Sequence, residues 1–184
     1  MTGVTESHSR RAYVAAVGSF GAAGLAGCSF SFGAENAGPK VDVVSAYRGG
    51  VERVDAGREQ YRTGTESLEG EEYAAAGDAY EQARAEFETA VERFAESVDL
   101  YDELDTEDGR DICTESRDAA EYFESSAAAM VSAAEATAEG RDDEAASLTE
   151  QARSDLDAAQ AKTVAGNAAL ENALGLDSGD SQRR

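Results

Sequence analysis

An aromatic side chain recurs every seven residues between positions 73 and 101, and this spacing constrains the fold more than any other feature. Seven residues make about two helical turns, so all five aromatics share one helix face. A companion series of mostly small residues stands three positions after each aromatic. The series are Tyr73, Tyr80, Phe87, Phe94 and Tyr101, and Ala76, Ala83, Ala90, Ser97 and Leu104. Because large and small side chains interdigitate, the stripe predicts the core face of a helix over residues 71–104; an aromatic ligand site is the alternative.

A heptad seam also runs along the stretch from Val41 to Leu68. Apolar residues alternate at steps of three and four, and the polar residues Arg58 and Thr65 fill the remaining places. The apolar members are Val44, Tyr47, Val51, Val54, Tyr61 and Leu68. Beside them Gly50, Gly57 and Gly64 repeat every seven residues, although glycine costs about 1 kcal/mol inside a helix. Because three glycines in register are costly, we expect them to be there for packing, with the backbone of another helix close to them.

Two more helices are expected, over residues 114–139 and 142–174. The predicted fold is therefore all-α, an elongated antiparallel four-helix bundle over residues 41–174, followed by a disordered tail at 175–184. Residues 81–88 match residues 150–157 at an offset of 69, whereas Gly70 and Gly140 are 70 apart. This indicates a duplicated helical hairpin with one indel, or a chance match of alanine-rich helices. Residues 140–145 weakly resemble the turn of a tetratricopeptide repeat, but that repeat is 34 residues long.

Residues 1–28 have the layout of an export signal. Arg10 and Arg11 precede an apolar run of about 15 residues, which is shorter than the roughly 20 that span a membrane. Residues 9–14, Ser-Arg-Arg-Ala-Tyr-Val, resemble a twin-arginine signal, and residues 25–28, Leu-Ala-Gly-Cys, resemble a lipobox. The resemblance implies a signal peptide over residues 1–27, cleavage between Gly27 and Cys28, and lipid on Cys28. A flexible tether is expected over residues 28–40, with the protein on the outer face of the cytoplasmic membrane.

The charge balance limits the partners. The chain has 38 acidic and 16 basic residues, a net charge of −22, and its only lysines are Lys40 and Lys162. Nucleic acid is not an expected partner, because phosphate binding requires a basic surface. The acidic excess, the scarce lysine and the leader together resemble exported lipoproteins of haloarchaea, and a field of this sign is a property that halophiles exploit.

The residues expected for common catalytic and metal sites are missing. The only histidine, His8, lies in the leader, which excludes histidine-based triads, di-iron sites and histidine-bound zinc in the mature chain. The acidic turn before Gly109 is not an EF-hand, because Leu104 stands where the first aspartate belongs. Cys113, the only cysteine besides Cys28, is expected to be a small half-buried residue. We therefore predict no enzyme activity, no cofactor and no metal.

Two functions remain open. The first is a membrane-anchored extracytoplasmic lipoprotein whose bundle is a protein-interaction or scaffold module for an unidentified partner. The alternative is a bundle that binds or senses a small ligand or cation between its helices. The scaffold predicts a large exposed apolar stripe. The ligand-binding bundle predicts an internal pocket with a few polar groups, and Arg58 and Thr65 are its first candidates.

Overall fold

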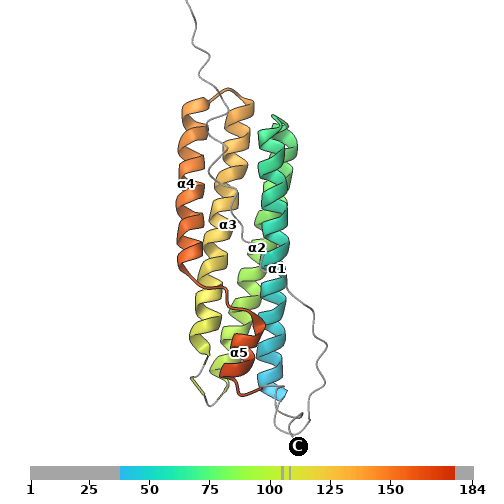
Figure 1. The fold of residues 1–184 in the computed structure, drawn as a ribbon, viewed down its shortest axis with the longest axis vertical. Helices are drawn as coiled ribbons and strands as arrows, with labels where there is room; N and C mark the ends of the chain where they lie inside the picture. The colour runs from blue at the N-terminus through green and yellow to red at the C-terminus, as the bar shows by residue number, and fades with distance from the viewer. Residues whose placement is uncertain (1–37, 105, 108, 177–184) are drawn as a thin grey trace, which may run out of the picture.

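The computed structural model describes residues 38–104, 106, 107 and 109–176. These residues form four long helices and one short one, without any strand in the described ranges (Figure 1). The helices are α1 (Gly38–Glu69), α2 (Tyr73–Asp102), α3 (Arg110–Ala138), α4 (Asp142–Ala161) and α5 (Asn167–Ala173). The all-α helical bundle predicted from the heptads is confirmed. Arg10, Arg11, Gly27 and Cys28 lie outside the described residues.

The four long helices run up and down in turn. Helix α1 packs closely along α2, α2 along α3, and α3 along α4, whereas α1 and α4 lack such close packing. The short helix α5 lies at the end of the bundle where α1 begins, and it contacts α1 and α3 (Figure 1). Helix α1 has 32 residues, which at about 1.5 Å per residue gives a rod of nearly 50 Å.

The glycine series of α1 forms sockets for the aromatic series of α2. A Cβ atom placed on Gly57 would lie 2.5 Å from Phe87 Cε1, and one on Gly50 would lie 2.6 Å from Phe94 Cε1. Gly64 stands in the same relation to the Tyr80 ring, at 2.8 Å. The expectation of backbone approach was therefore wrong in detail, because aromatic rings rest on the glycine backbone. Ring burial against α1 offsets the conformational cost of glycine.

The aromatic stripe is a core stripe, as its spacing predicts. Tyr80, Phe87, Phe94 and Tyr101 are fully buried, and Tyr73 at the helix start is half-buried. Phe87 stacks on Phe123 of α3, with ring centroids 5.3 Å apart. The core thus extends from the α1–α2 sockets across to α3.

The two hairpin turns, residues 67–72 and 136–141, have the same hydrogen-bond pattern. In each turn the last N–H donates to the first carbonyl, and the N–H before it donates to the second carbonyl, which is the Schellman arrangement. The bonds are Glu72 N to Ser67 O, Glu71 N to Leu68 O, Arg141 N to Ala136 O and Gly140 N to Thr137 O. The same turn therefore joins α1 to α2 and α3 to α4.

These turns correct the predicted register of the duplication. Glu71 and Gly140 both have positive φ, 62° and 73°, and the following residues Glu72 and Arg141 share a ψ of 63°. The counterpart of Gly140 is thus Glu71 and not Gly70. One offset of 69 residues then relates the turns and the matching segments 81–88 and 150–157, and no indel is needed.

Several boundaries differ from the predictions. Helix α1 begins at Gly38 rather than Val41, because Pro39 is tolerated in a first turn, where its missing N–H has no helical partner to lose. Helix α3 begins at Arg110, four residues before the predicted start. The expected helix over 142–174 is divided, because residues 162–166 are not helical. Gly175 and Leu176 of the predicted tail are described, and the remainder of that tail is not.

Cys113 lies in the first helical turn of α3 and is fully buried, deeper than expected. Burial raises the pKa of its thiol, which favours the protonated, unreactive form. The residue is therefore a small core side chain in this structure.

Candidate functional site

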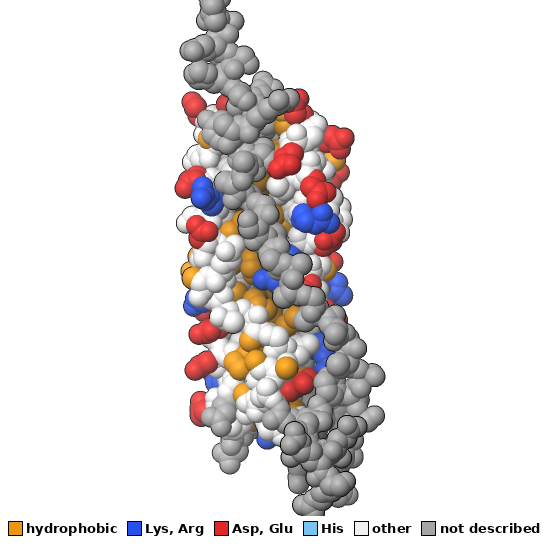
Figure 2. Space-filling model, in the orientation of Figure 1, with side chains coloured by type: hydrophobic (Ala, Val, Ile, Leu, Met, Phe, Trp, Pro, Cys, Tyr) orange, Lys and Arg blue, Asp and Glu red, His pale blue; other side chains and the backbone are white. Residues whose placement is uncertain are grey.

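Several buried polar side chains that bond to distant parts of the chain lie between α1 and α4, where both helices face α3. We call this strip the α1–α4 seam. It comprises Tyr47, Arg58 and Tyr61 of α1, Ser116, Phe123 and Ser126 of α3, Ala152 of α4 and Ala165. On this face hydrophobic side chains gather along the middle, between α4 and α1, and charged groups lie along both edges (Figure 2).

One hydroxyl relay links three helices across the seam. The Ser126 hydroxyl donates to the Ala152 carbonyl at 2.9 Å, so its oxygen accepts the Tyr61 hydroxyl at 3.1 Å. Burial raises the pKa of Tyr61 well above its ordinary value, and the bond to Ser126 offsets part of this shift. The relay therefore fixes a neutral phenol between α1 and α4.

A second relay lies two heptads away at Tyr47. The Tyr47 hydroxyl donates to the Ala165 carbonyl at 2.7 Å and lies 2.8 Å from Ser116 Oγ. Ser116 Oγ also donates to the Thr163 carbonyl, at 3.4 Å. Burial raises the pKa of Tyr47 to about 12. Because two carbonyls of residues 163–165 bond to side chains, this segment runs extended across the bundle, and α4 ends at Ala161.

Arg58 lies on α1 between the two relays. Its guanidinium carbon is 4.9 Å from the centroid of the Phe123 ring, and its Nη1 is 3.5 Å from Asp55 Oδ1. The Nε atom is buried and has no hydrogen-bond partner among the described residues. Burial lowers the pKa of Arg58, and Asp55 opposes that shift. A guanidinium with a buried, unused donor is costly, because a desolvated N–H loses its water without a replacement.

Thr65, the other polar residue of the α1 heptads, is fully used by the fold. Its hydroxyl lies 3.1 Å from both the Tyr61 carbonyl and the Tyr80 hydroxyl. Of the two candidates named from the sequence, only Arg58 therefore retains an unused polar atom. The seam brings Arg58 close to Phe123 and leaves Thr65 on the α2 side.

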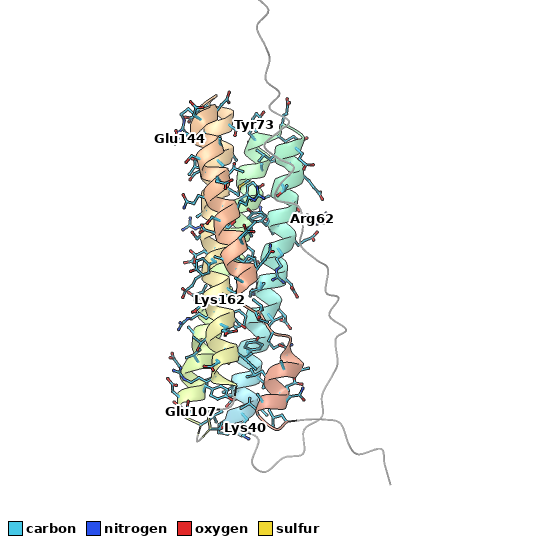
Figure 3. All side chains as sticks on the ribbon, turned by 60° about the vertical axis from the view of Figure 1, so that its left-hand side comes forward. Lys40, Arg62, Tyr73, Glu107, Glu144 and Lys162 are labelled. Carbon is cyan, nitrogen blue, oxygen red and sulfur yellow. The ribbon has the colours of Figure 1, made fainter. Side chains whose placement is uncertain are left out.

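The seam is closed at one end by α5 and its ion pairs. Glu171 is buried and lies 3.3 Å from Arg48, and Lys40 Nζ donates to the Leu174 carbonyl at 2.8 Å. Lys162, at the end of α4, pairs with Asp118 of α3 at 3.1 Å, partway along the rod (Figure 3). Both lysines of the chain thus hold the segment after α4. Sequence reasoning missed this closure, although Thr163, Val164 and Gly166 were a signal against helix.

The surface carries few features of other kinds of site. In the described ranges, no group of three or more metal-ligating side chains comes together, and no helix is long and apolar enough to span a membrane. Tyr122, at 39% exposure, is the only large hydrophobic side chain exposed on this part of the chain. The seam therefore remains the feature that invites a functional interpretation.

The chain was compared with known families and structures. No protein-family model, curated protein or solved structure matches it. What the seam does has to be argued from its own chemistry.

Proposed function

We propose that the chain is an exported lipoprotein that binds a small ligand in the α1–α4 seam, outside the cytoplasmic membrane. The observation that carries the binding proposal is the buried Arg58 Nε, an unused donor in a mostly apolar strip. Native proteins pair most buried donors with an acceptor, so an unpaired donor buried in the seam is a candidate ligand contact.

The anchoring proposal is supported by the leader and by the position of α1. The motifs at residues 9–14 and 25–28 stand at the separation expected of a twin-arginine leader with a lipobox. Because α1 starts at Gly38, Cys28 is ten residue steps away along the chain, a span of at most about 33–36 Å. A lipid on Cys28 would therefore hold the bundle within one protein diameter of the membrane.

Ligand binding is favoured here over the scaffold role. A scaffold would use a large exposed apolar stripe, and on the described surface the exposed large hydrophobics reduce to Tyr122. Protein partnership remains the competing proposal, and affinity capture from membranes in high salt tests it. A single abundant envelope partner, retained when Arg58 is replaced by Leu, would contradict ligand binding in the seam as the main role.

The anchor is tested separately by fractionation of cells that express the full chain or its Cys28→Ser variant. We expect the full chain in the membrane fraction with Cys28 at its N-terminus and lipid on the sulfur. The variant is expected to lose the lipid and to leave the membrane. An unmodified Cys28 within an intact leader would overturn the lipoprotein proposal without affecting the seam.

A further inference from the structure

We infer that residues 162–176, which we call the closing segment, open as a unit while the four long helices stay folded, and that rising salt favours this opening. Little of the segment is buried, side chains of α1 and α3 hold it in place, and it carries no net charge. Opening of this kind goes beyond ligand binding in the seam and does not depend on it.

The closing segment contributes little to the core. Its buried side chains are Leu170, Glu171 and Leu174, and residues 162–166 are not helical. Helix α5 contacts α1 and α3 much less extensively than neighbouring long helices contact each other. Burial of two leucines offsets only part of the entropy that is lost when the whole segment is ordered. Segments with few buried apolar contacts are the ones that open before a protein unfolds as a whole.

Polar contacts with α1 and α3 keep the closing segment in place. Three of its backbone carbonyls accept hydrogen bonds from side chains of these helices, in the pairs Ser116–Thr163, Tyr47–Ala165 and Lys40–Leu174. Two ion pairs join the same elements, Lys162–Asp118 at 3.1 Å and Arg48–Glu171 at 3.3 Å. The hydrogen bonds are only partly buried, so water can replace them when the segment leaves.

Three of these contacts involve a charged side chain, and salt weakens such contacts. Lys162 and Asp118 expose 38% and 29% of their side chains, and Arg48 exposes 36%. Between charges with this exposure to water, the range of the interaction falls from about 10 Å at 0.1 M salt to about 3 Å at 1 M. Rising salt should therefore loosen the attachment of the closing segment.

The closing segment has no self-repulsion of its own for salt to relieve. Lys162 and Glu171 are its only charged residues, so its net charge is zero, whereas the whole chain carries −22. Screening reduces the mutual repulsion of the acidic helices and stabilises the bundle. The same screening removes attraction between the segment and the bundle. Salt should therefore act in opposite directions on the closing segment and on the four long helices.

Opening uncovers an apolar part of α1. Lys40, Tyr47 and Arg48 contact the closing segment. Val44 lies three or four residues from each of them, so it shares their helix face. Val44 is 2% exposed and Tyr47 is completely buried while the segment is closed. This face lies at the end of the bundle where α1 begins, the end nearest in sequence to the proposed anchor at Cys28 (Figure 1).

Hydrogen exchange of the full chain, unlipidated as Cys28→Ser, followed by mass spectrometry in 0.2 M and 2 M potassium chloride tests the inference. Protection relative to unstructured peptides in the same salt gives the opening equilibrium of each segment. We expect residues 167–174 to open at least about ten times more readily than α2. Their opening should increase about threefold or more from low to high salt, as expected for the loss of one or two exposed ion pairs, while that of α2 decreases.

Lys162→Met separates the attachment of the segment from a general effect of charge. Loss of the ion pair with Asp118 should increase the opening of residues 167–174 at low salt and reduce its dependence on salt. Arg62→Leu is the matched control, because it removes the same charge from an exposed position on α1 whose ion pairs are with Glu59 and Glu66 (Figure 3). It should leave the opening of residues 167–174 unchanged.

Three results would overturn the inference, and each can be read from the chain without the two variants. Residues 167–174 could exchange together with α4 as one unit, or their opening could decrease with salt in parallel with that of α2. Exchange at the unprotected rate at both salt concentrations would have the same consequence, because the segment would then not close.

Discussion

At the scale of single residues, Glu71 stands in a conformation that suits glycine. Its φ of 62° lies in the left-handed region, which costs a residue with a Cβ about 1–2 kcal/mol. We therefore expect Glu71→Gly to raise the free energy of unfolding by about 1 kcal/mol. Chemical denaturation in high salt measures this. Gly140→Ala should lose a similar amount at the equivalent position, where no neighbour lies within 4 Å of the added Cβ. A destabilised Glu71→Gly would contradict the shared turn geometry.

Gly57 tests the socket between α1 and α2. Its replacement by alanine places a methyl 2.5 Å from Phe87, whose ring is fully buried and also stacks on Phe123. Overpacking of this kind costs about 1–3 kcal/mol, so the unfolding free energy should fall despite the better helix propensity of alanine. Gly77→Ala in α2 is the control, because nothing lies within 4 Å of its Cβ, and it should gain up to about 1 kcal/mol. Equal effects at both sites would exclude the socket.

At the scale of helices, heptad spacing was enough to predict where α2 and α3 lie and which faces are buried. Heptad spacing did not predict the end of α4, because the helical spacing of apolar residues continues through residues 142–174 although the helix is interrupted at 162–166. Leu156 and Leu170 are both buried, yet one lies in α4 and the other in α5. The break depends on the Tyr47 and Ser116 hydroxyls, which are 118 and 47 residues away from the carbonyls they bind. Such long-range bonds leave no local pattern.

The surroundings of Arg58 likewise could not be predicted from local sequence spacing. The heptads identified it as a polar residue in an apolar seam, and this position is correct. Its cation–π contact with Phe123 and the unused Nε follow from how α1 and α3 face each other, which one helix cannot reveal. Thr65 carried the same sequence signal and proved to be satisfied within the fold.

The α5 closure should depend on Tyr47. Tyr47→Phe removes the hydroxyl that donates to the Ala165 carbonyl, and we expect a loss of about 1 kcal/mol, because this part-buried acceptor loses its donor. Hydrogen exchange followed by mass spectrometry should show faster exchange in residues 162–174 than in α2. Tyr122→Phe, on the exposed face of α3, is the matched control. Uniform protection of the α5 region in the Tyr47 variant would contradict this role.

At the scale of the whole molecule, the buried phenols predict loss of stability in alkali. Burial raises the pKa of Tyr47 and Tyr80 to about 12, above the ordinary value of 10.0, and shifts Tyr61 in the same direction. A raised folded-state pKa means that stability is fully present below pH 10 and is lost as pH rises toward 12. Phenolate absorbance and circular dichroism should change together in this range. Ionisation of all the tyrosines near pH 10 in a folded protein would contradict the burial.

The offset of 69 residues, shared by the two hairpin turns, makes the α4–α1 interface the counterpart of the α2–α3 interface. Two copies of a hairpin related by 69 residues would close a symmetric bundle, with α4–α1 equivalent to α2–α3. In the second hairpin, however, residues 162–166 are not helical, so α4 is ten residues shorter than α2. At the same interface Arg58 stands where the offset of 69 residues places Ala127 in the second hairpin. The interface that lacks close packing is thus also the one that carries Arg58, and this supports the binding proposal at that place.

The net charge of −22 and the helix ends together predict how salt acts on the whole bundle. No described helix has a basic residue in its last turn, and α1 ends at Glu69, where a negative charge faces the negative end of the helix dipole. Repulsion of this kind reaches about 30 Å at 0.01 M salt and about 3 Å at 1 M. The melting temperature should therefore rise with potassium chloride.

Two charge reversals separate the contribution of net charge from that of the helix end. Glu69→Lys and Glu92→Lys change the net charge equally, but Glu92 lies in the middle of α2, away from the end of its dipole. At low salt both variants should be more stable than the parent chain, and Glu69→Lys should gain roughly a further 0.3–1 kcal/mol. Both gains should shrink in 2 M salt because the charges are screened. If the two gains are equal, only net charge matters, and if neither variant gains, self-repulsion does not limit the fold.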